Sequence, residues 1–242
     1  MPGSSLWLLP PPSHPLHPVL TTLVRETLPT QFPREAASSP AVTPHFFAAH
    51  VTLTSEIPAS RYGDDPQGWL DSIPFFFPAA AAAPSAEGKE GGRGGGGGGG
   101  GGGGVKVRFE KVVTQDVFFR RCFIRVGYGG VKELAGVARA VGVIGEEVGG
   151  DGKDGKFGKE TEKWLTKWRE EYGPHLSLMY GDVPITDEAL KKVTRAVQEA
   201  GIQLAEEKPE GSGWDGWDGG VVWLVPTDKS IAEWKPIATR EL

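Results

Sequence analysis

Two four-residue segments with the same pattern constrain the fold of this chain more than any other feature. Residues 50–53 read HVTL and residues 175–178 read HLSL, so each has a histidine, an apolar residue, a hydroxyl residue and a second apolar residue. Alternation of polar and apolar residues is typical of a half-buried β-strand, in which residues two apart point to the same face. We therefore expect two strands that each present an imidazole and a hydroxyl on one face and bury apolar side chains on the other.

The residue types in these two segments suit acid–base chemistry on a phosphate. One imidazole, from His50 or His175, can take a proton from water while the other protonates a departing oxygen. The hydroxyls of Thr52 and Ser177 can hydrogen-bond the remaining phosphate oxygens. The periodicity alone fits equally well a histidine on the solvated face of a strand beside a β-favouring residue.

A segment of low complexity interrupts the chain. Residues 78–104 read PAAAAAPSAEGKEGGRGGGGGGGGGGG, a composition that cannot bury a core and predicts a disordered insert. Residues 209–220 (PEGSGWDGWDGG) are also typical of a loop, and we expect Trp214 and Trp217 there to be exposed or to cap a surface. The rest suffices for one compact core, so we expect residues 1–242 to form a single bilobal domain around the insert.

Composition excludes several classes of protein. The net charge is −5 and no Lys/Arg stripe dominates, which disfavours a long nucleic-acid partner. The single cysteine, Cys122, rules out an intramolecular disulfide, favours a reducing compartment and is expected to be a core thiol. No apolar run is long enough to span a membrane, and no His/Cys/Asp/Glu group has metal-ligand spacing. We expect a cytoplasmic monomer without a metal or cofactor.

Hydrophobic periodicity predicts alternating strands and helices. The expected strands are residues 4–9, 45–55, 105–113, 117–126, 174–181, 221–225 and 234–242; the expected helices are residues 15–32, 64–73, 131–143, 157–172 and 186–200. Thr186 has the residue type of an N-cap, and Gly201 is typical of a helix end. This order predicts an α+β fold with antiparallel sheets and helices on the outside, in which the two motifs face a central cleft.

Further segments resemble a known family. The start LWLLPP, the segment DVFFRRCFI, the second motif in PHLSLMYGDVPIT and the end VPTDKSIAEWKPIATREL are similar to the 2H phosphoesterase superfamily, most closely to the fungal and plant cyclic phosphodiesterases. The similarity covers nearly the whole chain outside the low-complexity segments. The sequence departs from the family pattern at Ala49, because family members often have a proline directly before the first histidine. His45 follows a proline but has Phe47 two residues later, so His50 remains the motif histidine.

The resemblance implies a bilobal 2H phosphoesterase-like fold, with two antiparallel sheets facing a central cleft. It also implies metal-independent hydrolysis of 2′,3′-cyclic nucleotides to 2′-phosphates, and of ADP-ribose 1″,2″-cyclic phosphate, a by-product of tRNA splicing. It makes His175 the general base and His50 the general acid. Because one histidine must start neutral and the other protonated, we expect a bell-shaped pH dependence of kcat/KM centred near the ordinary imidazole pKa of about 6.5. By resemblance to fungal members only, association with the Golgi is an alternative to the expected cytoplasmic location.

Residues beside the motifs give further candidates for substrate contact. The resemblance implies that Tyr180 lines the cleft, and Trp7 is a candidate for the same wall, where it would stack on a base. Of Arg120 and Arg121, at most one can face the cleft, because neighbouring strand residues point to opposite faces.

Two other functions stay open at this point. One is an RNA end-processing or 2′–5′ RNA ligase-like enzyme of the same superfamily. The other is a non-catalytic nucleotide-binding protein on the same fold, which the two intact motifs disfavour.

Overall fold

The computed structural model of the chain describes residues 3–39, 41, 43–75, 104–146, 148, 157–206 and 213–242. The insert predicted at 78–104 lies outside the described residues, apart from Gly104.

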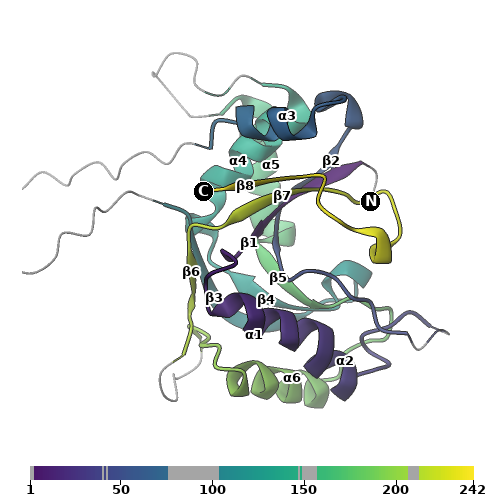
Figure 1. The fold of residues 1–242 in the computed structure, drawn as a ribbon. Coiled ribbons are helices and arrows are strands. Elements are labelled where there is room, and N and C mark those ends of the chain that lie inside the picture. Colours follow the sequence, from purple (N-terminus) through teal and green to yellow (C-terminus); the bar gives the residue numbers. More distant parts are fainter. Residues whose placement is uncertain are drawn as a thin grey trace, which may run out of the picture.

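Within the described residues, eight strands form one antiparallel sheet in the order β6-β3-β4-β5-β2-β1-β7-β8 (Figure 1). The strands are β1 (Ser4–Leu9), β2 (Val51–Ile57), β3 (Lys106–Thr114), β4 (Cys122–Val126), β5 (His175–Met179), β6 (Gly216–Asp218), β7 (Val221–Pro226) and β8 (Ala238–Glu241). This sheet and the helices around it confirm the predicted α+β class.

The sheet consists of two four-stranded halves that meet at one seam. The half β6-β3-β4-β5 and the half β2-β1-β7-β8 join where β2 pairs with β5, and this pairing has a single register pair, Val51 with Leu176. The neighbouring strands within each half pair over longer stretches, from Ser4 to Leu9 in the case of β1 with β7. The two sheets expected from the sequence are therefore present as two halves of one curled sheet.

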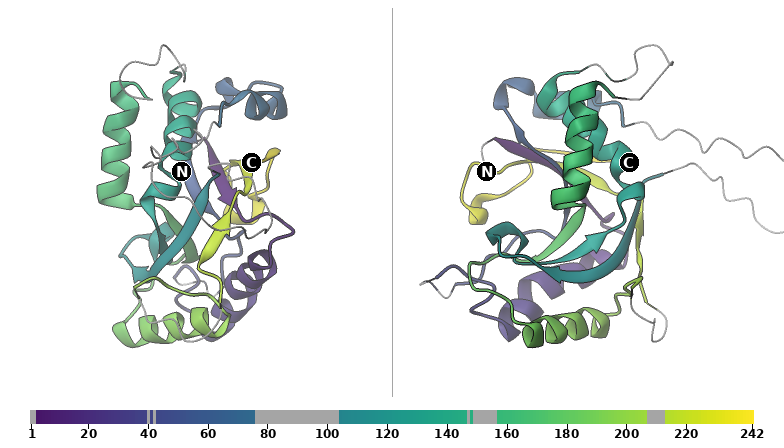
Figure 2. Two further views of the ribbon diagram at one scale, coloured as in Figure 1. Left: turned by 90° about the vertical axis from the view of Figure 1, so that its left-hand side faces the viewer. Right: turned by 180° about the vertical axis from the view of Figure 1, so that it is seen from behind.

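Helices lie at both ends of the molecule (Figures 1 and 2). At one end lie α1 (Leu16–Thr22), the π-helical turn η1 (Leu23–Thr27), α2 (Leu28–Gln31) and α6 (Asp187–Glu199); at the other lie α3 (Pro66–Ser72), α4 (Lys132–Arg139), η5 (Ala140–Ile144), α5 (Lys159–Lys167) and η6 (Trp168–Tyr172). The N-cap predicted at Thr186 is confirmed, because its side chain accepts a hydrogen bond from the Ala189 N–H at 3.2 Å.

Helices from each half pack across the seam onto the other half. The segment η1–α2 connects β1 to β2 in one half, yet it contacts β5 of the other half. Conversely, α4 comes between β4 and β5 in the sequence but packs against β2. Because a helix of each half packs on a strand of the other, the short β2–β5 pairing is not the only contact that joins the two halves.

The apolar motif residues point into the core as predicted. Val51, Leu53, Leu176 and Leu178 are at most 1% exposed and belong to the main hydrophobic cluster. Burial of side chains of this size contributes roughly 1.5–3 kcal/mol each. Cys122 is also fully buried, and burial raises its pKa to about 12, so it is the core thiol expected from the sequence.

The structure corrects the bounds of three predicted strands. The first motif strand was predicted over 45–55 but begins at Val51: the His45 N–H bonds the Ala36 carbonyl, and the Ala48 carbonyl bonds the His50 side chain, so neither joins the sheet. The strand predicted over 117–126 begins at Cys122, after a 3₁₀ turn. The last strand begins at Ala238 rather than at residue 234, again after a 3₁₀ turn.

The predicted loop 209–220 contains a strand. Residues 216–218 form β6 on the edge of β3, where the Arg108 guanidinium binds the Asp218 carboxylate at 2.6 Å. Trp217, expected to be exposed or capping, is 1% exposed and packs on Phe109 with ring centroids 5.8 Å apart. Trp214 is 42% exposed, as expected.

Candidate active site

The seam between the two halves brings both motifs together. Val51 pairs with Leu176, and the strands run antiparallel. Extending that register by one residue on each side places His50 opposite Ser177 and Thr52 opposite His175. Residues directly opposite each other share a face, so the four polar side chains lie on the face away from the buried apolar residues. The two motifs thus form a square in which each histidine faces the hydroxyl of the other motif.

The two histidines occupy one diagonal of this square. Diagonal neighbours on an antiparallel pair lie about 7–8 Å apart at their Cα atoms, which lets both side chains reach one phosphate. The two imidazoles also interact electrostatically, because His175 lowers the pKa of His50. The structure therefore places the predicted pair as neighbours, on adjacent strands from different halves.

Both imidazoles are oriented by the same backbone contact. His50 Nδ1 lies 2.6 Å from the Ala48 carbonyl oxygen, and His175 Nδ1 lies 3.0 Å from the Gly173 carbonyl oxygen. A carbonyl only accepts hydrogen bonds, so Nδ1 carries the proton in each ring. Nε2 is then the reactive nitrogen in both residues: it accepts a proton when the ring is neutral and donates one when the ring is charged.

Burial lowers the pKa values of both imidazoles below the ordinary 6.5 on which the sequence-based expectation rested. It lowers that of His50 to about 3; the bond to Ala48 opposes this shift and His175 adds to it. Burial also lowers the pKa of His175 to about 4, opposed by the bond to Gly173 and reinforced by Arg120. Both rings are consequently neutral at neutral pH in the free protein.

These pKa values change the expected pH dependence. A reaction that needs one neutral and one protonated histidine follows the singly protonated form, whose fraction in the free protein falls about tenfold per pH unit above the higher pKa. We therefore expect the optimum of kcat/KM, which reports the free protein, to lie on the acid side of pH 6.5. The optimum of kcat should lie at higher pH, because a bound anionic phosphate raises the imidazole pKa.

Both profiles can be measured on one cyclic nucleotide from about pH 4 to about pH 9, with the fold monitored at each pH. A kcat/KM optimum at or above pH 6.5 would contradict this account of the free protein.

The two hydroxyl residues of the square differ in their surroundings. Ser177 is buried, and its Oγ donates to the Phe119 carbonyl at 3.2 Å. Its hydroxyl also acts on Tyr180, where it opposes the rise of the tyrosine pKa that burial causes. Thr52 is half-buried on β2, opposite Trp7 on β1. To bind a phosphate oxygen, the Ser177 hydroxyl must turn away from the Phe119 carbonyl.

The sequence-predicted residues Trp7 and Tyr180 both border the square. The Trp7 ring stacks on the His50 ring, with centroids 3.7 Å apart and planes 10° apart. Tyr180 is 3% exposed and stacks on Phe47 at 3.9 Å. Burial raises the pKa of Tyr180 above its ordinary value, so its hydroxyl stays protonated at neutral pH.

The two arginines before β4 have separate positions. Arg121 is buried, where it donates to the Gly181 carbonyl at 2.9 Å and pairs with Asp116 at 2.7 Å. Arg120 donates to the Glu171 carbonyl and lies over the Tyr172 ring, yet its charge lowers the pKa of His175. Arg120 is therefore the one of the two whose charge acts on the square.

Sequence reasoning missed three aromatic residues around the square. Phe47 lies against His50 as well as Tyr180, with ring centroids 6.3 Å from the His50 ring. Phe119 and Trp234 lie next to Tyr180, with centroids 5.3 and 6.1 Å from its ring. The only sequence signal for Phe119 and Trp234 was that each falls in a segment similar to the family, which does not tell where a side chain points.

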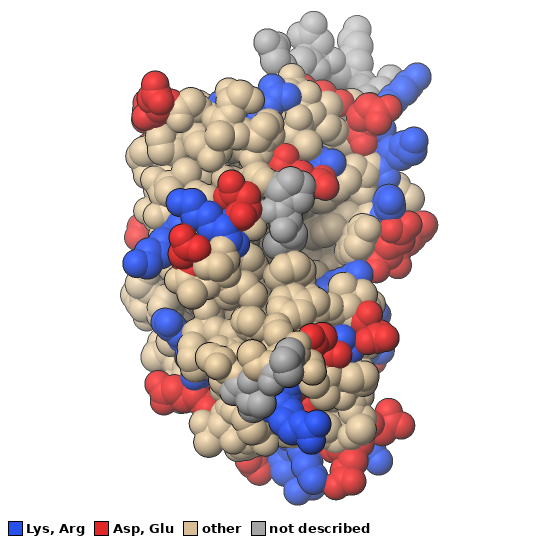
Figure 3. All heavy atoms as spheres, turned by 90° about the vertical axis from the view of Figure 1, so that its right-hand side faces the viewer, with Lys and Arg blue, Asp and Glu red and all other residues tan. Residues whose placement is uncertain are grey.

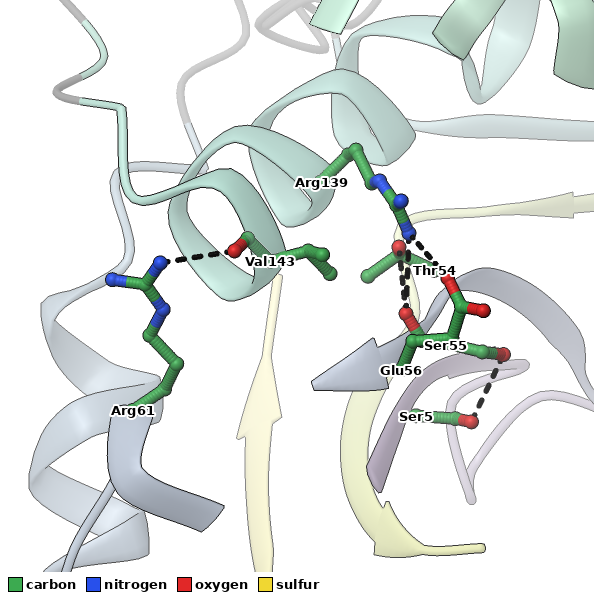
Figure 4. Close-up of polar contacts among 7 residues, drawn as sticks. All are labelled: Ser5, Thr54, Ser55, Glu56, Arg61, Arg139 and Val143. Carbon is green, nitrogen blue, oxygen red and sulfur yellow. Dashed lines mark hydrogen bonds and ion pairs between the residues drawn. The ribbon is translucent and has the colours of Figure 1, made fainter. Parts of the chain in front are cut away.

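A polar cluster fixes the far end of β2, the strand that carries Thr52 (Figure 4). Arg139 on α4 contacts the Glu56 carboxylate at 3.2 Å and the Ser55 carbonyl at 3.4 Å. Ser5 on β1 donates to the Ser55 hydroxyl at 3.0 Å. Glu56 has a φ of 68°, which is uncommon for a non-glycine residue. Because α4 belongs to the other half, these contacts align β2 across the seam.

The face that carries the β7–β8 loop and the N-terminus has few charges at its middle (Figure 3). Among its described residues, acidic and basic side chains are mixed and lie mostly toward the edges. Among all described residues, no three His, Cys, Asp or Glu side chains lie close enough to hold a metal ion. In the same part of the chain, no helix has the length and apolar character needed to cross a bilayer.

The chain is similar to proteins of one family over its full length. Residues 1–242 match the family model described as "Cyclic phosphodiesterase-like protein". A Neurospora crassa protein named 2′,3′-cyclic-nucleotide 3′-phosphodiesterase is 52% identical over 245 residues, covering 100% of both chains. Proteins of the same name from Phaeosphaeria nodorum and Yarrowia lipolytica are 39% and 25% identical, covering 100% and 99% of both chains.

Proposed function

Because the chain belongs to the cyclic phosphodiesterase-like protein family, we propose that it hydrolyses 2′,3′-cyclic nucleotides to nucleoside 2′-phosphates without a metal. The observation that carries this proposal is the square at the seam, in which two imidazoles with reactive Nε2 atoms alternate with two hydroxyls. Each half supplies one motif, so the site needs both halves. We infer that residues 1–242 work as one bilobal domain.

The proposed reaction follows from the positions of these four groups. The cyclic phosphate lies over the square, and Thr52 and Ser177 donate hydrogen bonds to its non-bridging oxygens. His175 Nε2 takes a proton from water as the water oxygen bonds to phosphorus. The bond from phosphorus to the 3′ oxygen breaks, and that oxygen takes the proton from His50 Nε2. One water is added, and the product is the 2′-phosphate.

Two contacts support this division of roles. Trp7 stacks on His50 at 3.7 Å, and an aromatic face stabilises the positive charge of a protonated imidazole. Arg120 lowers the pKa of His175 and so favours the neutral ring that a base requires. The pKa of His50 nonetheless lies below that of His175, which is the reverse of what the roles need in the free protein. The assignment therefore rests on the family resemblance and these two contacts.

The same site suits ADP-ribose 1″,2″-cyclic phosphate, which we propose as a further substrate, with ADP-ribose 1″-phosphate as the product. It contains a cyclic phosphodiester on adjacent ribose oxygens, so the four groups of the square act on the same kind of phosphorus–oxygen bond. Long RNA is a poorer fit, because the net charge is −5 and the described residues of the face in Figure 3 present mixed charges at the edges.

The proposed function is tested by comparing two kinds of substrate. Turnover of 2′,3′-cyclic AMP is measured beside turnover of an oligonucleotide that ends in a 2′,3′-cyclic phosphate. We expect the mononucleotide to be the better substrate by kcat/KM. A strong preference for the oligonucleotide would favour an RNA end-processing enzyme, and inactivity on both would favour a binding protein.

We expect hydrolysis to continue in excess EDTA. Two imidazoles supply the base and the acid, and two hydroxyls bind the phosphate oxygens, so every step has a group on the chain. The measurement is the rate on 2′,3′-cyclic AMP after prolonged chelation, compared with the untreated protein. Loss of activity that a divalent ion restores would overturn the metal-independent mechanism.

A further inference from the structure

The face of the sheet that carries the square continues onto strand β4. This strand lies next to β5, on the side away from β2, and its Arg125 is directly opposite His175. Residues directly opposite each other share a face, so Thr52, His175 and Arg125 form a line across β2, β5 and β4. Neighbouring strands are about 5 Å apart, which places the backbone of Arg125 about 5 Å from that of His175 and about 10 Å from that of Thr52.

A ring contact shows independently that this face of β4 is the face of the square. Phe123, two residues before Arg125 on the same strand, packs on His175 with ring centroids 5.0 Å apart. Phe123 is buried, whereas Arg125 is the exposed residue of β4. The Arg125 guanidinium has no hydrogen bond, ion pair or ring contact with another described residue. It is therefore an available cation one strand away from a candidate catalytic histidine.

Arg120 brings a second guanidinium to the same side of the square. It ends the turn η3 (Phe118–Arg120), and the carbonyl directly before it, that of Phe119, accepts the hydrogen bond of Ser177. Its guanidinium donates one hydrogen bond, to the Glu171 carbonyl at 3.1 Å. A guanidinium has five N–H donors, so the other four have no acceptor among the described residues. The charge reaches the square, because it lowers the pKa of His175.

The two positive charges are not neutralised by the protein. Neither Arg120 nor Arg125 forms an ion pair with a described carboxylate. Glu171 is the carboxylate whose charge acts on Arg120, but its side chain pairs with Lys167 at 3.7 Å. The His175 side of the square is therefore positively charged, although the whole chain has a net charge of −5. Guanidinium groups suit phosphate in particular, because parallel N–H donors match two phosphate oxygens.

We propose that Arg125 and Arg120 form a subsite for a second phosphate group of the substrate, carried on carbon 5 of the ribose that bears the cyclic phosphate. This inference rests on the proposed function and deepens it, because it names the substrate class. One ribose ring separates the two groups, a span that fits the one to two strands between the square and Arg125. The favoured substrates are cyclic phosphodiesters with a further phosphate or diphosphate, which ADP-ribose 1″,2″-cyclic phosphate carries on this ribose.

The test compares two substrates that differ only in the second phosphate. Wild-type protein is assayed on 2′,3′-cyclic AMP and on 5′-phosphoadenosine 2′,3′-cyclic phosphate. We expect kcat/KM to be about 10-fold higher for the 5′-phosphorylated substrate, mainly through a lower KM. This preference should shrink as the salt concentration rises from about 0.05 M to about 0.5 M, because salt screens partly exposed charges.

Each variant is judged by the ratio of its two kcat/KM values, in which an effect common to both substrates cancels. Arg125→Gln and Arg120→Gln should each lower the ratio about 3- to 10-fold, and Arg125→Glu should bring it below one through repulsion. Arg125→Lys keeps the charge and should retain most of the preference. Arg195→Gln is the matched control, because Arg195 is exposed and forms no ion pair with a described residue on α6, at one end of the molecule (Figure 1). It should change neither rate.

Two results would overturn the subsite: a wild-type ratio near one, or a ratio that Arg125→Gln and Arg125→Glu leave unchanged. Calorimetric titration separates these results from failure of the proposed function. Adenosine 2′,5′-bisphosphate should bind wild type about 10-fold more tightly than adenosine 2′-phosphate, and Arg125→Glu should abolish the difference. If wild type turns over neither substrate, the proposed function fails, and equal binding of the two ligands would then refute the subsite separately.

Discussion

Replacing either histidine of the square by alanine is expected to lower kcat on 2′,3′-cyclic AMP by about 10²- to 10⁴-fold. Each substitution removes one proton-transfer step that no other side chain of the square can perform. His45→Ala is the matched control, because His45 bonds Ser38 at 2.8 Å and packs on Phe118, outside the square. The control should stay within about threefold of wild type, and thermal unfolding of all three variants should show that each is folded.

The roles of the two histidines separate with a substrate whose leaving group needs no proton. On a cyclic phosphodiester with a strongly acidic leaving group, His50→Ala should recover most of its lost activity, because only the acid is missing. His175→Ala should stay inactive, because water still needs a base. Recovery of activity in His175→Ala but not in His50→Ala would exchange the two roles. If neither variant recovered activity, the histidines would act in some other way.

Loss of the hydroxyls should also be costly. Thr52→Val and Ser177→Ala are each expected to lower kcat about 10- to 10³-fold, because each removes a donor aimed at charge that builds on phosphate during attack. Ser55→Ala, which removes a hydroxyl of the same strand β2 that bonds Ser5 instead of the square, should have little effect on kcat. An equal loss in Ser55→Ala and Thr52→Val would mean that β2 had been disturbed, and full activity of Thr52→Val and Ser177→Ala would remove the hydroxyls from the mechanism.

Much of the fold could be predicted because periodicity and capping are local. The strand at Ser4–Leu9 has the predicted bounds, and the helix at Asp187–Glu199 begins after the predicted cap Thr186. Errors arose where a tertiary contact decided the local structure. β6 forms in a glycine-rich segment because it pairs with β3 and buries Trp217 against Phe109, and no pattern within residues 209–220 indicates that partner.

The sequence predicted which residues form the candidate site, but not how their side chains are arranged in space. The pattern of the two motifs identified the four side chains of the square, and the resemblance added Tyr180 and Trp7. The sequence predicted that the two motifs face one cleft, but not that β2 and β5 would be adjacent strands of one sheet, which depends on the order of strands. It also could not predict the lowered histidine pKa values, since these arise from burial under residues such as Trp7 that are distant in the chain.

The most direct test of the central claim is the structure of the product. Wild-type protein in EDTA is mixed with 2′,3′-cyclic AMP, and phosphorus NMR follows which phosphate ester appears. The mechanism predicts adenosine 2′-phosphate as the sole product, formed at a rate that falls at least about 100-fold in both His50→Ala and His175→Ala. Adenosine 3′-phosphate as the product, or an undiminished rate in either variant, would contradict it.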